Sequence, residues 1–215
     1  MKKNYSYVAM LTGLLMAASG TTNAASVLFT SFEQYGSDPV DYVVSIDDLT
    51  AGFFNVKVKI AENSPNQGDI RGIAFALNYE ITADDISGSD ITKIGLNTLN
   101  NQGGNNFNGQ GSSLFTVENN YFLLSIGSPG SSSGFISSTN FSIASLGNSL
   151  ENAFSVFGVR AQSVGPNGSG SSKDISTTFA FDGAPVPAPS AVWFMGSGLI
   201  GLMGFSRKGK ATVKA

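Results

Sequence analysis

The chain has 215 residues, of which only 13% are charged, and it contains neither cysteine nor histidine. The absence of both residue types excludes Ser-His-Asp and Cys-His catalysis, disulfide bonds, and metal or haem sites built on His or Cys ligands. Residues 25–185 carry all 15 acidic residues but only six of the 12 basic residues, and this net charge of −9 argues against a nucleic-acid partner.

Residues 1–24 are predicted to be a secretory signal peptide. Lys2 and Lys3 precede an apolar run from Val8 to Ala18, and small residues then lead to Ala24. This order of a basic, an apolar and a small-residue region is typical of export signals. We expect the secretion machinery to export the chain and signal peptidase to cut between Ala24 and Ala25. The alternative is an uncleaved N-terminal anchor.

Residues 25–185 are predicted to form one all-β domain, an antiparallel β-sandwich or jelly roll of about eight or nine strands. In FFNVKVKI (53–60) apolar and polar residues alternate, which indicates a half-buried strand, and GIAFALNY (72–79) repeats the pattern. Further strands are expected at 27–32, 42–46, 121–126, 135–143, 154–164 and 175–181. Helical periodicity is limited to a turn or two in TADDIS and SLENAF. The Gly- and Asn-rich segment 100–113 is predicted to be the least ordered part of the domain.

No catalytic residue is assigned. A carboxylate pair of the glycosidase type or a Ser-Lys arrangement is the chemistry that remains without His or Cys. The glutamates are scattered, however, and nothing in the sequence marks two of them as facing each other: they are Glu33, Glu62, Glu80, Glu118 and Glu151. We interpret them as solvated turn residues and keep a secreted carbohydrate-active hydrolase as an alternative function.

Aspartates in two loops are the candidates for a calcium site. Asp47 and Asp48 are adjacent, and DDISGSD places Asp84, Asp85 and Asp90 around a glycine, which supplies the oxygen ligands that calcium prefers. The spacing does not match the helix-loop-helix calcium signature, and aspartate is also favoured in turns because it bonds to its own backbone. We prefer the turn interpretation, and a calcium-dependent adhesion module is a further alternative.

A sugar-binding surface would have to use tyrosine or phenylalanine, because the only tryptophan, Trp193, lies near the C-terminus. The aromatic candidates in the domain are Tyr35, Tyr42, Tyr79, Tyr121 and an exposed phenylalanine such as Phe107. Packing in the core or in turns is the preferred interpretation for each of them.

The uncharged stretch from Ser190 to Ser206 is predicted to be a membrane helix with cytoplasmic positive charges at Arg207, Lys208 and Lys210. It contains GSGLIG, which has the glycine spacing of dinucleotide-binding folds. Prolines precede this motif where a strand is required, and no acidic residue follows it, so we reject the nucleotide interpretation. Its glycines either form a surface for another membrane helix or merely lower the hydrophobicity of the segment; they are Gly196, Gly198, Gly201 and Gly204.

The segment VPAPSAVWFMGSGLIGLMGFSRKGK resembles the PEP-CTERM sorting signal of Gram-negative bacteria, in which a Pro-x-Pro motif, a short glycine-rich membrane helix and a basic cluster follow one another. Ala188 stands where the motif has glutamate. The resemblance implies that an exosortase, a membrane cysteine protease, recognises and removes the tail. The recognition element would be Val186, Pro187, Ala188 and Pro189.

The resemblance also implies a location and a role. The chain would be held transiently in the inner membrane and would then reach the cell surface or the extracellular space. Proteins with this tail are generally associated with exopolysaccharide, biofilm or floc matrix. Our first hypothesis is therefore a noncatalytic surface or matrix protein whose partners are polysaccharide or other matrix proteins.

Overall fold

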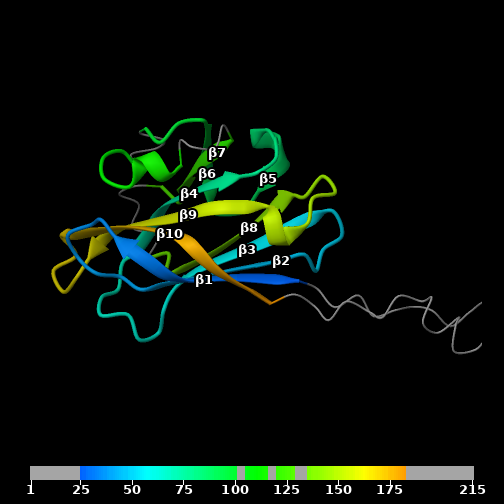
Figure 1. The fold of residues 1–215 in the computed structure, drawn as a ribbon. Helices are drawn as coiled ribbons and strands as arrows, with labels where there is room; N and C mark the ends of the chain where they lie inside the picture. Colours follow the sequence, from blue (N-terminus) through cyan, green and yellow to red (C-terminus); the bar gives the residue numbers. More distant parts are fainter. Residues whose placement is uncertain (1–24, 101–104, 116–119, 129–134, 183–215) are drawn as a thin grey trace, which may run out of the picture. The chain divides into compact units, whose positions relative to one another are not determined.

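The computed structural model describes residues 25–100, 105–115, 120–128 and 135–182, which lie in one compact unit (Figure 1). Their regular structure consists of strands and three short 3₁₀ turns, and no helix within these ranges is long and apolar enough to cross a membrane. The strands are β1 (Ser26–Gln34), β2 (Tyr42–Asp47), β3 (Phe53–Ile60), β4 (Asp69–Leu77), β5 (Ile86–Ser87), β6 (Ile91–Leu96), β7 (Tyr121–Ile126), β8 (Ser138–Ala144), β9 (Phe154–Val164) and β10 (Gly170–Asp182). The turns are η1 (Ala83–Asp85), η2 (Ser112–Leu114) and η3 (Leu150–Asn152).

The ten strands form one antiparallel sheet in the order β5-β8-β3-β2-β1-β10-β9-β4-β7-β6. Hairpins join β1 to β2, β2 to β3, β6 to β7 and β9 to β10, whereas the β1–β10, β3–β8 and β4–β9 pairs connect distant parts of the chain. The sheet curls around its main core, because residues of β5 and β8 at one edge and of β7 at the other belong to the same buried cluster. In the view of Figure 1, β9 and β4 lie above β8, β3 and β2.

The prediction of an antiparallel all-β domain is confirmed. The predicted strands at 53–60, 121–126 and 154–164 match β3, β7 and β9 residue for residue. The number of strands is ten rather than eight or nine, because β5 and β6 were not predicted. All ten strands belong to one hydrogen-bonded sheet, whereas a sandwich is built from two.

The main core is rich in phenylalanine, and Phe75 of β4 lies at its centre. Its ring packs against those of Phe122, Phe141, Phe154 and Phe157 with centroid distances of 5.3 to 6.2 Å. Each fully buried phenylalanine contributes about 1.5–3 kcal/mol through the removal of apolar surface from water. The core therefore joins strands β4, β7, β8 and β9.

A second, smaller core lies on the opposite face of β4, β7 and β9. It contains Ala74 and Ala76 of β4, and the loop before β7 covers it with the fully buried rings of Phe107 and Phe115. All nine residues of β4 are therefore buried, and the prediction of a half-buried strand at 72–79 is wrong. The loop before β7 covers the second face of β4, and no local pattern in β4 indicates that loop.

Residues 105–113, predicted to be poorly ordered, pack on the sheet through Phe107. Glycines make room for its ring: a Cβ atom at Gly158 would lie 2.8 Å from the Phe107 ring, and one at Gly72 would lie 3.2 Å from it. Two cations hold the loop, since Arg160 Nη1 donates to Asn106 O at 2.7 Å and Lys173 Nζ donates to the carbonyls of residues 108 and 110. Burial lowers the pKa of both cations, and for Lys173 the charge of Arg160 adds to the effect.

Candidate functional site

The outer face of β2, β3, β8 and β5 carries a row of polar side chains that crosses all four strands. Strand pairing places Asp47 opposite Asn55, Asn55 opposite Ser142, and Ser142 opposite Ser87. Alternation explains the row, because the residues between these positions, such as Val56, point into the core. Strand pairing therefore brings together, in one polar row, residues that lie up to 95 positions apart in the chain.

Hydrogen bonds fix the orientation of this row. Asn55 Nδ2 donates to Asp47 Oδ1 at 2.8 Å and to Thr50 Oγ1 at 3.1 Å, and Ser142 Oγ donates to Asn55 Oδ1 at 3.3 Å. Asp47 Oδ1 also accepts the backbone N–H of Leu49 at 3.1 Å. The amide of Asn55 is thus held from both sides, and a ligand that bonds to this row meets side chains that are already ordered.

Lys57 of β3 and Asn140 of β8 lie opposite each other and form the next row of outward-facing side chains. Both rows line an open pocket of about 350 Å³ on the sheet surface. Gly88 forms one wall and approaches β8 so closely that a Cβ atom there would lie 2.8 Å from the Cβ of Phe141. We define the outer polar face as Asp47, Asn55, Lys57, Ser87, Asn140 and Ser142.

The charge around this face is distinctive in an acidic domain. Arg71 forms a buried ion pair with Asp69, the only ion pair within the described ranges, and Arg160 and Lys173 bind loop carbonyls. Lys57 and Lys59 on β3 and Lys93 on β6 form no ion pair within the described ranges, and Lys57 is exposed on the outer polar face. The outer polar face therefore offers amides, hydroxyls and an ammonium group.

The outer polar face combines hydrogen-bonding groups with one carboxylate and a neighbouring exposed ring. Asp47 is the only carboxylate among the residues that line the described pocket, so these residues do not include a carboxylate pair of the glycosidase type. Phe53, two residues before Asn55 on β3 and 41% exposed, adds an apolar ring on the same side of the strand. Polar groups beside an exposed ring suit a hydroxyl-rich ligand.

The predicted calcium candidates Asp84, Asp85 and Asp90 have separate local roles. Asp85 Oδ2 accepts the N–H and the Oγ1–H of Thr82, both at 2.8 Å, and these bonds lower the pKa of Asp85. Asp90 Oδ2 accepts Thr139 Oγ1 at 2.8 Å, and Asp84 is exposed. The described ranges contain no group of three or more acidic side chains that could hold a metal ion.

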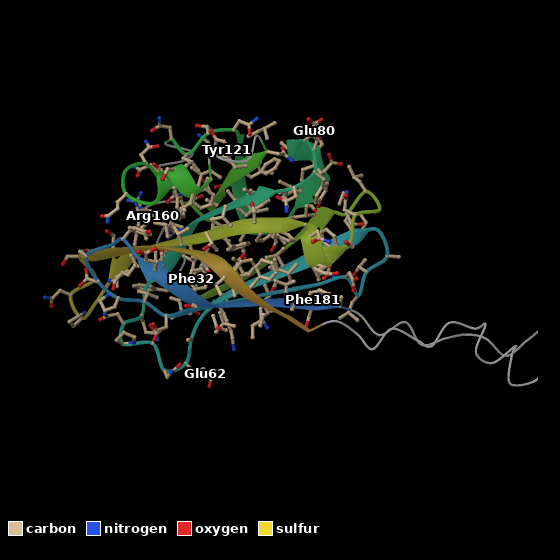
Figure 2. All side chains as sticks on the ribbon, viewed as in Figure 1. Phe32, Glu62, Glu80, Tyr121, Arg160 and Phe181 are labelled. Carbon is tan, nitrogen blue, oxygen red and sulfur yellow. The ribbon has the colours of Figure 1, made fainter. Side chains whose placement is uncertain are left out.

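The aromatic candidates mostly serve packing, as predicted. Tyr42 is buried, and Tyr79 is half-buried with its hydroxyl donating to Ala144 O at 3.0 Å. The expectation that Phe107 is exposed is wrong, because its ring is fully buried in the second core. Burial raises the pKa of Tyr79 and Tyr42 above the ordinary range of tyrosine. Among the glutamates that the structure describes, Figure 2 shows Glu62 and Glu80 on opposite sides of the domain.

Sequence reasoning missed the outer polar face and a second polar cluster formed by Tyr42, Ser172 and Asp174. The alternation in residues 53–60 did indicate that Asn55 and Lys57 face outward. No local signal indicated that β8 lies beside β3. No local pattern indicated the second cluster, because Tyr42, which bonds to Ser172, lies 132 positions before Asp174 in the chain.

The predicted processing elements lie outside the described residues, apart from Ala25. These are the signal peptide, the sorting motif at 186–189, the membrane glycines and the basic residues after 206. Ala25 itself is tied to the β2–β3 hairpin, since its N–H donates to Asp48 Oδ1 at 2.8 Å. No family model, curated protein or solved structure matches the chain.

Proposed function

We propose that this chain is an exported, noncatalytic surface or extracellular matrix protein that binds polysaccharide through the outer polar face. The observation that carries the proposal is the ordered row of Asp47, Asn55 and Ser142 beside an open pocket. Sugar hydroxyls both donate and accept hydrogen bonds, and amide, carboxylate and hydroxyl groups satisfy both roles. Because these groups are held before binding, little side-chain entropy is lost on contact.

The proposal includes the fate of the two ends of the chain. Signal peptidase cuts after Ala24, the membrane segment holds the domain at the outer side of the inner membrane, and an exosortase then cuts near Pro187. The support is the order of sequence features: a signal peptide, an acidic domain, a Pro-x-Pro motif, an uncharged segment and a basic tail. An exported domain meets extracellular polysaccharide, which connects this route to the proposed ligand.

The ligand proposal is tested by measuring the affinity of the full-length chain for a panel of neutral and acidic bacterial polysaccharides. We expect replacement of Asn140 by alanine to weaken binding about 5- to 10-fold, which corresponds to the loss of about one net hydrogen bond. Asn167→Ala is the matched control, because Asn167 is an equally exposed asparagine in the β9–β10 loop. Binding that both variants retain, or no binding to any polysaccharide, would contradict the proposal.

A further inference from the structure

A gap opens between β1 and β2 because the two strands pair over only part of their length. Their pairing runs from Ser26 opposite Asp47 to Phe29 opposite Val44. Beyond Phe29, β1 continues along β10 alone, and its register with β10 shifts twice. Residues 30–32, 34 and 39–42 then border a pocket of about 270 Å³.

Asp174 of β10 lies at the floor of this pocket and is only 2% exposed. One of its carboxylate oxygens accepts the hydroxyl of Ser172, and Ser172 in turn accepts the hydroxyl of Tyr42 at 3.1 Å. The raised pKa of Tyr42 keeps that phenol protonated, so the chain of donors points at Asp174. No basic side chain within the described ranges forms an ion pair with Asp174.

The described residues that line this pocket offer oxygen atoms and no basic group. Asp41 supplies a second carboxylate at the exposed rim, Thr30 and Ser31 supply hydroxyls, and Gln34 supplies an amide. A buried carboxylate without a positive partner is costly, and a bound cation removes that cost. Hard divalent cations such as calcium take six to eight oxygen ligands from carboxylates, neutral oxygens and water.

We propose that the pocket between β1 and β2 is a calcium site in which Asp174 and Asp41 are the carboxylate ligands. Asp174 anchors the ion, since Ser172 and Tyr42 hold its carboxyl in place. Neutral oxygens of β1 complete the coordination shell of the ion together with water, for which the pocket has room. Two carboxylates correspond to the weak affinities, about 10⁻⁴ to 10⁻³ M, of extracellular calcium modules.

This site is separate from the outer polar face and from Asp84, Asp85 and Asp90, which the sequence suggested. It lies on the inner side of β10, where Tyr42 belongs to the main core. An ion there would join β1, β2 and β10 at the point where hydrogen bonding between β1 and β2 stops. Its expected effect is therefore a stabilisation of the fold.

The test uses the full-length chain at pH 8, after removal of metal with a chelator. We expect 10 mM calcium to raise the melting temperature by about 4–8 °C and magnesium to raise it much less. Asp174→Asn should abolish the calcium response, and Asp41→Asn should weaken calcium binding about 10-fold in calorimetry. Asp84→Asn, an exposed aspartate of η1, should retain the full response.

The site would be overturned by the absence of heat or a melting shift up to 10 mM calcium, by a full response in Asp174→Asn, or by loss of the response in Asp84→Asn. Asp41 is exposed, so its replacement tests the site even where a change at Asp174 alters the fold. An unchanged calcium affinity in Asp41→Asn would likewise refute the assignment. No polysaccharide is present in these measurements, so the outcome is independent of the proposed ligand of the outer polar face.

Discussion

Replacing Asp174 by asparagine should stabilise the metal-free domain at alkaline pH. Burial is the main cause that raises the pKa of this carboxyl to about 7; the hydrogen bond from Ser172 opposes the rise, and the charge of Asp41 adds to it. In the unfolded chain the pKa of aspartate is about 3.9. The native state therefore binds the proton more tightly than the unfolded state does.

The sign of the pH dependence follows from this difference. Between about pH 4 and pH 7 the native state holds more protons, so the contribution of Asp174 to the free energy of unfolding falls as pH rises. Above pH 7 the full cost is present, and the two pKa values set it at no more than about 4 kcal/mol. Because the carboxyl borders an open pocket that water reaches, we expect about 2 kcal/mol.

The assay is urea or thermal unfolding of the wild type and Asp174→Asn from pH 4 to pH 8.5, with a chelator present. The variant should be about 2 kcal/mol more stable at pH 8, which corresponds to about 4–8 °C in melting temperature, and the two curves should converge near pH 4. Comparing the two proteins at each pH cancels the titration of the other carboxylates. A difference that does not change with pH, or a variant that is less stable at pH 8, would refute the reasoning.

Two further predictions concern the second core and the C-terminal tail. In urea unfolding, Phe107→Ala should lower the free energy of unfolding by about 3–5 kcal/mol, because the ring is fully buried against Phe115. The control is Leu114→Ala, which should lower it by under about 1 kcal/mol because Leu114 is partly exposed. Equally small losses in both variants would show that the loop contributes little to stability. In the native host, mass spectrometry should place the mature C-terminus between residues 186 and 189, and a C-terminal peptide containing Trp193 from fully processed protein would exclude removal of the tail.

The local sequence pattern was sufficient to predict the long strands, but it did not predict the short strands or which strands pair. Alternation in 53–60 and the apolar runs at 121–126 and 154–164 predicted β3, β7 and β9, because each is long enough to show its period. β5 has two residues and no period to detect. In β6, ITKIGL, the apolar residues do not alternate regularly, since its pairing with β7 is interrupted by a register shift.

The candidate sites show the same division between local and distant information. The turn role of Asp85 was predictable, because its partner Thr82 lies three residues away. The outer polar face depends on the β3–β8 pair, whose residues lie 79 to 91 positions apart, and hydrophobic pattern does not determine which strands pair. A sequence of this kind shows which residues point outward but not which outward residues meet.

Irregular pairing of β1 with β10 explains why a carboxyl and the core lie on the same side of β10. Side chains alternate along a strand, so Asp174 and Phe179, five residues apart, would ordinarily face opposite sides. Both nevertheless face the main core, because the register with β1 shifts between Ile175 and Thr178. Ser176 stabilises this irregularity by donating to Thr178 O at 2.8 Å and accepting Thr178 N–H at 3.2 Å.

The register shifts therefore have two effects on the same strand pair. They bring Phe179 onto Phe29 of β1, with ring centroids 5.3 Å apart, and this contact adds apolar burial to the core. They also leave Asp174 on the inner side, beneath the point where β1 and β2 separate. A strand pair without the shift would turn either Phe179 or Asp174 to the other face, so the polar pocket and this part of the core depend on the same irregularity.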